Sequence, residues 1–153
     1  MTENLFYKLK IQIVIDNFIN NIINNNKVFI IEHKDEIAIS QSLLFKDDAG
    51  NPVNVVCFWS DKQIAAKCCI DVWKQYKPQE ICIATFIEDY LVNVYNESFI
   101  SGLDFNEHME GIETDPLDLI MALIGALKKS KINLEFEYFK NLNDLESQLQ
   151  KLL

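Results

Sequence analysis

The sequence predicts a single α+β domain, in which a small, mostly antiparallel sheet is packed with helices. The chain has 153 residues, a length at which one hydrophobic core buries most of the apolar surface. Hydrophobic residues make up 49% of it, with only four Gly and three Pro, which is typical of a folded chain. Hairpin-like pairs of short runs alternate with helical segments, without a regular strand–helix–strand repeat. We therefore expect about five strands covered by helices, in one compact domain over residues 1–153.

The N-terminal third contains one helical pattern and three strand patterns. Apolar residues recur at helical spacing from Leu5 to Asn24, where a run of Asn ends the helix. Two short β-branched runs, 27–32 and 36–40, predict a hairpin. A turn cluster then leads into a run over 53–59, whose nearly continuous apolar character predicts a central strand buried on both faces.

The middle of the chain predicts two helices with a short strand between them. Residues 60–63 fit a capping box, with Ser60 as the N-cap, so we expect a helix from there to about Lys74 that ends before Pro78. A short strand over 81–83 and a helix over 85–95 follow.

The C-terminal third predicts a hairpin followed by two helices. Residues 98–103 and 108–113 alternate weakly around a polar turn. Asp115 and Pro116 suit the cap and the first position of a helix that continues to about Leu127. The stretch 134–153 predicts an amphipathic helix, although 134–138 could equally be a strand.

Charge and targeting signals restrict the partners. With 23 acidic against 14 basic residues, the net charge is −9, which disfavours nucleic acid. Neither a signal peptide nor an uninterrupted apolar stretch of roughly 20 residues is evident, so we expect a cytoplasmic protein without a membrane span. The charge suits a basic protein partner, but it is also an ordinary means of staying soluble.

The cysteines and histidines do not predict a metal or cofactor site. Four cysteines lie in apolar surroundings and are expected to be core thiols: Cys57, Cys68, Cys69 and Cys82. Their spacing lacks the Cys-x-x-Cys or Cys/His pattern of zinc sites, and neither histidine lies near them in sequence. We therefore expect no metal and no cofactor.

The triplet Trp59-Ser60-Asp61 contains two residue types found in catalytic triads. A serine nucleophile, however, needs a base within hydrogen-bond reach and a glycine-flanked elbow, and the sequence indicates neither. Helix capping explains Ser60 and Asp61 without catalysis. We therefore expect no enzymatic activity.

Two groups of residues are candidates for binding. Trp59, Trp73 and Tyr90 could line an aromatic pocket, and Trp73 with Tyr76 could be exposed as a contact surface, although such aromatics usually belong to the core. The densest acidic cluster comprises Glu107, Glu110, Glu113, Asp115 and Asp118. It could meet a basic partner, or it could be a solvated loop.

Several short motifs, in order, resemble a known family. Residues 58–61 form an apolar-Trp-Ser-Asp corner, and Ala65 follows. A Tyr-x-Pro-x-Glu-Ile segment spans 76–81, and Phe86 lies in the helix after it. Together these resemble the bacterial domain-of-unknown-function 2750 family.

The resemblance covers roughly residues 10–125. Tyr90-Leu91 stands where the family usually has Trp-Leu, and 111–117 resembles its closing Gly-x-x-x-Pro segment. The resemblance implies a small α+β domain without a known activity, and it leaves about 126–153 as a C-terminal helical extension.

Two functions lead at this point, and an unrecognised enzyme is a third hypothesis. The first is a non-enzymatic protein-binding module with an acidic face, for example a bacterial immunity or regulatory protein, by analogy of size, charge and fold style. The alternative is a small-molecule-binding domain with the aromatic pocket near Trp59 and Trp73.

Overall fold

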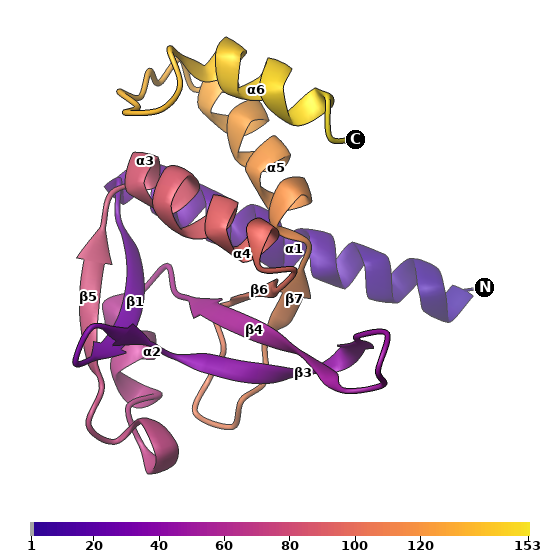
Figure 1. Cartoon of the computed structure of the whole chain (residues 1–153), viewed down its shortest axis with the longest axis vertical. Helices are drawn as coiled ribbons and strands as arrows, with labels where there is room; N and C mark the ends of the chain where they lie inside the picture. Colours follow the sequence, from indigo (N-terminus) through magenta and orange to yellow (C-terminus); the bar gives the residue numbers. More distant parts are fainter. Residues whose placement is uncertain (1) are drawn as a thin grey trace.

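A computed structural model describes the backbone of residues 2–153 and the side chains of residues 5–153. It confirms an α+β domain, with most of the helices on one side of the strands (Figure 1). In chain order the elements are α1 (Thr2–Asn25), β1 (Val28–His33), β2 (Glu36–Ile37), β3 (Ile39–Lys46), β4 (Pro52–Phe58), α2 (Lys62–Lys67), η1 (Asp71–Trp73), β5 (Lys77–Ile81), α3 (Ile83–Thr85), η2 (Phe86–Leu91), α4 (Val92–Asn96), β6 (Ile100–Leu103), β7 (Ile112–Thr114), α5 (Pro116–Lys129) and α6 (Leu142–Gln150).

The strands form two sheets, where the sequence predicted one sheet of about five strands. One sheet has the order β2-β1-β5 and is antiparallel, and the other has the order β3-β4-β6-β7. In the second sheet β4 and β6 run parallel, so this sheet is mixed. The sheets meet where Phe29 and Trp59 exchange two backbone hydrogen bonds of 2.8 Å. The single-sheet prediction is wrong because strand pairing between distant segments has no local signal.

Strand β4 is the central strand that the apolar run predicted. Its residues alternate between two hydrophobic clusters, as the two-residue period of a strand requires. Val56 and Phe58 pack in the larger cluster, with α1, α5, α6 and the helical segment 83–96. Val55 and Cys57 pack in the smaller cluster, together with Trp59, Trp73 and Phe105. Both faces of β4 are therefore buried.

The helix predicted after Ser60 is shorter than expected. The N-cap is Asp61, whose carboxylate accepts hydrogen bonds from the backbone N–H of Gln63 and of Ile64 at 2.7 and 3.3 Å. Helix α2 ends at Lys67, and a single 3₁₀ turn, η1, follows it. The capping box and the long helix were thus wrong, because the segment after α2 turns toward an edge of the first sheet.

Pro78 lies within β5, where the sequence predicted only the end of a helix. Strand β5 is at the edge of its sheet, a position in which proline's missing N–H breaks no ladder bond. The short strand predicted over 81–83 is also displaced, because Ile83 begins α3. From Ile83 to Asn96 the chain is one continuous helical segment, and its middle part, η2, is a π-helical turn.

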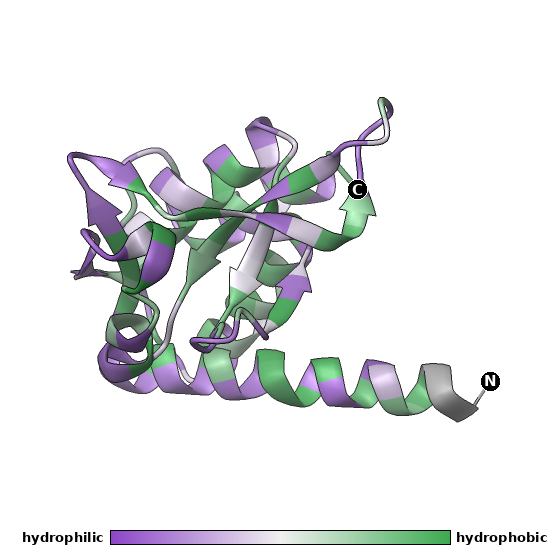
Figure 2. Ribbon diagram, turned by 90° about the horizontal axis from the view of Figure 1, so that it is seen from below, coloured by the Kyte–Doolittle hydropathy of each residue, from purple (hydrophilic) through white to green (hydrophobic). Residues whose placement is uncertain are grey.

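The remaining predicted elements are largely confirmed. β6 and β7 pair as a hairpin, and Asp115 caps α5 by accepting from the N–H groups of Leu117 and Asp118. Helix α1 extends its N-terminal half beyond the rest of the domain (Figure 2). None of the helices in the described part of the chain has the length and apolar character needed to cross a membrane.

The final stretch is only partly helical. Helix α6 covers Leu142–Gln150, whereas 134–138 forms neither the helix nor the strand that the sequence allowed. This segment is irregular because two of its backbone N–H groups donate to a side chain. The carboxylate of Glu88, in η2, accepts from Glu137 and Tyr138 at 2.8 and 2.7 Å.

Candidate functional site

The triplet Trp59-Ser60-Asp61 is a structural corner. The indole N–H of Trp59 donates to the backbone oxygen of Phe105 at 2.8 Å. Ser60 donates its backbone N–H and its hydroxyl to the carboxylate of Asp104, at 2.7 and 2.9 Å. Burial raises the pKa of Asp104. The corner therefore ties the end of β4 to the loop after β6, and Ser60 is engaged in that contact.

The three aromatic residues of the predicted pocket lie in two different hydrophobic clusters. Trp59 is fully buried and Trp73 is 5% exposed, and their rings meet edge to face at 6.4 Å in the smaller cluster. Tyr90 lies against Phe58 at 6.2 Å, in the larger cluster. Because Phe58 and Trp59 are neighbours on a strand, they face opposite sides, and so do their partners.

The predicted contact surface at Trp73 and Tyr76 is also reduced. Trp73 belongs to the core, while Tyr76 is partly buried and lies 5.8 Å from the ring of His33. Only Tyr76 of this pair therefore keeps appreciable contact with solvent.

The predicted acidic cluster divides into two kinds of residue. Glu113 accepts hydrogen bonds from the Ser42 hydroxyl and from the Leu43 N–H, and Asp115 caps α5. These two carboxylates therefore stabilise the fold. Glu107, Glu110 and Asp118 are exposed. Whether they meet a partner stays a prediction.

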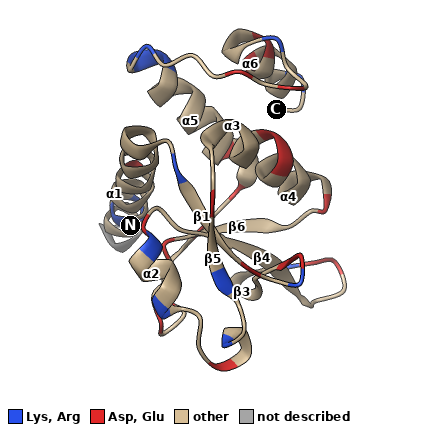
Figure 3. Ribbon diagram, turned by 90° about the vertical axis from the view of Figure 1, so that its left-hand side faces the viewer, with Lys and Arg blue, Asp and Glu red and all other residues tan. Residues whose placement is uncertain are grey.

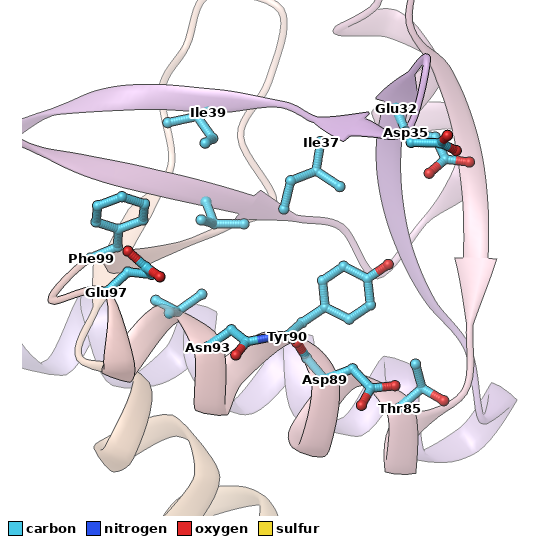
Figure 4. Close-up of a pocket in the computed structure, with 12 residues that line it drawn as sticks. Glu32, Asp35, Ile37, Ile39, Thr85, Asp89, Tyr90, Asn93, Glu97 and Phe99 are labelled. Carbon is cyan, nitrogen blue, oxygen red and sulfur yellow. Dashed lines mark hydrogen bonds between the residues drawn. The ribbon is translucent and has the colours of Figure 1, made fainter.

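A cavity of about 460 Å³ lies between the helical segment 83–96 and the strands β1 to β4 (Figure 4). Its lining comes from three stretches of the chain that are distant in sequence, namely residues 32–39, Val56 and residues 85–99. The lining residues are Glu32, Asp35, Ile37, Ile39, Val56, Thr85, Asp89, Tyr90, Asn93, Val94, Glu97 and Phe99. The candidate site is this cavity.

The cavity combines acidic groups with an apolar floor. Four of its 12 lining residues are carboxylates, namely Glu32, Asp35, Asp89 and Glu97, and none of the 12 is a lysine. Figure 3 shows the same asymmetry, with acidic residues on the helical segment labelled α3 and α4 and basic residues on α2. Such a site is electrostatically matched to a positive charge.

Tyr90 stands near the middle of the cavity, with its hydroxyl toward the end that holds Glu32 and Asp35 (Figure 4). Burial, with the negative charges of Glu32 and Asp89, raises the pKa of Tyr90. The side chain is therefore a neutral phenol at physiological pH, with an O–H that can donate and a ring face that can attract a cation. It lies on the π-helical turn η2, and such turns are frequent at functional sites.

Sequence reasoning identified only Tyr90 among these residues. The four carboxylates are separated along the chain, so no dense acidic run marked them. One signal was available, because Asp89, Asn93 and Glu97 follow at steps of four and therefore share a helix face. The other side of the cavity depends on how β1 and β2 pair, which has no comparable local pattern.

The four cysteines are not equivalent. Cys57 and Cys68 are buried as expected, and burial raises the pKa of Cys57 to about 12. Cys69 is partly buried, and burial also raises the pKa of its thiol. Cys82 is exposed, so the core prediction was wrong for this residue. It precedes α3, and a hydrogen bond with the hydroxyl of Thr85 at 3.3 Å lowers the pKa of the Cys82 thiol.

We expect Cys82 to react first with a thiol reagent. A lowered pKa means that a larger fraction of Cys82 is thiolate at pH 7, and the thiolate is the nucleophile. Mass spectrometry after brief iodoacetamide treatment of the native protein should show one modification, on Cys82, with Cys57 unmodified until the chain unfolds. The rate of modification of Cys82 should increase with pH. This increase should occur at a lower pH in the native chain than in a Thr85→Val variant. Earlier modification of Cys57 would contradict this expectation.

No three His, Cys, Asp or Glu side chains within the described residues converge to hold a metal ion. The carboxylates around the cavity therefore do not converge on a common metal position.

Comparison with known proteins identifies the family. The model of a family described as protein of unknown function, DUF2750, matches residues 15–123, a span that contains every residue lining the cavity. No curated protein and no solved structure matches the chain. Because the family model covers more than half of its length, the chain belongs to the DUF2750 family.

Proposed function

We propose that this protein is a non-enzymatic binding domain whose cavity beside Tyr90 holds a small, positively charged ligand with an apolar part. The observation that carries the proposal is the composition of the cavity, which joins an apolar floor to four carboxylates and no lysine. A volume of about 460 Å³ is also within the range of small-molecule sites.

Each part of the lining has a role in this proposal. The carboxylates attract the cation, the Tyr90 ring offers a face for a cation–π contact, and the apolar floor buries the rest of the ligand. The 12 lining residues include no histidine, the most frequent general base, and no cysteine or lysine nucleophile. This composition favours binding over catalysis. A cytoplasmic location remains part of the proposal.

A thermal-shift screen tests the proposal. We expect amines with an apolar part to raise the Tm of the full chain by about 5–10 °C at roughly one hundred times Kd. Tyr90→Leu and Asp89→Asn should weaken this shift, because each removes one element of the site. Glu107→Gln is the matched control, since it removes the same charge from the exposed β6–β7 loop. A screen in which only neutral or anionic compounds stabilise the protein would reject the proposal.

The second candidate function is a protein-binding module, regulatory or immunity-related, with an acidic face for a basic partner. The observation that favours it is the exposure of Glu107 and Glu110 on the β6–β7 loop of a chain with net charge −9. Charge reversal at both positions should then slow association with a captured partner, most strongly at low salt. A partner that binds the reversed variant equally well would remove the support for this face.

A further inference from the structure

The carboxylates of the cavity lie at two separate ends. Figure 4 shows Glu32 and Asp35 together at one end and Glu97 at the other, with Asp89 along the helical side. Among the described residues, these carboxylates do not come together as the ligands of a metal site do. A single compact cation therefore cannot approach both ends at once.

The space between the two ends is mostly apolar. Ile37 lies between them, and the Tyr90 ring projects into the same space (Figure 4). Val56 and Val94 also contribute apolar side chains to the lining. An uncharged hydrocarbon chain is the chemical group that such a surface buries most favourably. Asn93 and Asp89, on the helical side, are the polar groups along this stretch that a central amino group of a longer ligand could meet.

Among the side chains of residues 5–153, none forms an ion pair with these four carboxylates. The ion pairs among the described residues are Lys27–Glu80, His108–Glu107 and Lys128–Glu146. None of these involves a carboxylate of the cavity. Like charges gathered around an apolar floor repel one another, and a bound cation at each end would relieve that repulsion.

We propose that the cavity binds a linear aliphatic diamine or a longer linear polyamine as a free small molecule. One ammonium group lies against Glu32 and Asp35, the other lies against Glu97, and the methylene chain crosses the apolar floor beside Tyr90. This inference rests on the proposed function, because it specifies the cationic ligand of that same cavity. A lysine side chain of a protein has only one ammonium group and would occupy one end alone.

Isothermal titration of the full chain at low ionic strength tests the inference with a matched series. The probes are 1,4-diaminobutane, 1,5-diaminopentane and spermidine, compared with n-butylamine, which lacks the second charge, and 1,4-butanediol, which lacks both. We expect the best diamine or polyamine to bind at least about threefold more tightly than n-butylamine, and the diol not to bind.

Variants at each end show whether both ends take part. Glu97→Gln and Glu32→Gln should each weaken binding of the best diamine about threefold, toward the affinity of n-butylamine. The monoamine should lose affinity in only one of the two variants, since it occupies one end. Glu107→Gln changes the net charge equally at a distant loop and should leave both affinities unchanged.

The outcomes separate this inference from the function on which it rests. Equal affinity for diamines and n-butylamine would overturn the two-ended site and leave a site for single cations. Failure of all amines, with another compound bound in a Tyr90-dependent way, would overturn the inference and the cationic proposal, but not binding at the cavity. If Glu107→Gln weakened amine binding as much as the cavity variants do, general charge attraction and not this cavity would hold the amines. That result would also overturn the inference.

Discussion

Replacing Trp59 by alanine is expected to lower the free energy of unfolding by about 3–5 kcal/mol, the usual cost of removing a large buried aromatic side chain. Trp59 is fully buried, and its ring packs edge to face against Trp73. Its loss would leave a cavity in the smaller core cluster and would remove the indole donor to the Phe105 oxygen. Urea denaturation followed by far-ultraviolet circular dichroism measures the change.

Two controls show where this energy comes from. Trp59→Phe keeps most of the apolar volume but not the indole N–H, so we expect a smaller loss, about 1–3 kcal/mol. Val72→Ala removes an apolar side chain that is 86% exposed and should change stability by no more than about 0.5 kcal/mol. If Trp59→Ala were as mild as Val72→Ala, the buried corner would not have the structural role assigned to it.

Replacing Glu88 by alanine is expected to cost about 2–4 kcal/mol, because two backbone donors would lose a charged acceptor. Glu88 is 9% exposed and accepts from the N–H groups of Glu137 and Tyr138. These bonds hold the irregular segment before α6 against the π-helical turn η2. Denaturation gives the energy, and amide hydrogen exchange at residues 137 and 138 should become faster.

Two further variants separate the hydrogen bonds of Glu88 from a general effect of removing an acidic side chain. Glu88→Gln keeps one carbonyl acceptor, so about half of the loss is expected. Glu135→Ala alters an exposed acidic residue of the same C-terminal segment and should change stability by no more than about 0.5 kcal/mol. Unchanged exchange at residues 137 and 138 in Glu88→Ala would show that other contacts hold the segment.

The hydrogen bonds of Glu88 join the family region to the C-terminal stretch of the chain. The family match ends at residue 123, yet Leu142, Leu145 and Leu149 of α6 lie in the larger core cluster with α1 and α5. The C-terminal stretch is therefore part of the hydrophobic core of this chain. Glu88 faces that stretch, while the next two residues, Asp89 and Tyr90, line the cavity.

Local patterns predicted the elements whose cause is local. The periodicity of α1, the cap at Asp115 and the β6–β7 hairpin depend on residues a few positions apart, and each is found in the structure. The apolar run of β4 likewise predicted a strand buried on both faces. For these elements the side-chain chemistry of a short window determines the backbone.

The sequence by itself thus determined the fold class and most helices and strands. Tertiary structure alone decided that the Ser60 hydroxyl donates a hydrogen bond to Asp104, 44 residues away. It also decided that Pro78 lies in an edge strand that pairs with β1. It also decided that Trp59 and Tyr90 face different clusters, and that four scattered carboxylates surround one cavity. The physical reason is that these contacts join segments distant in sequence, whose pairing depends on the packing of the whole chain and not on any one window.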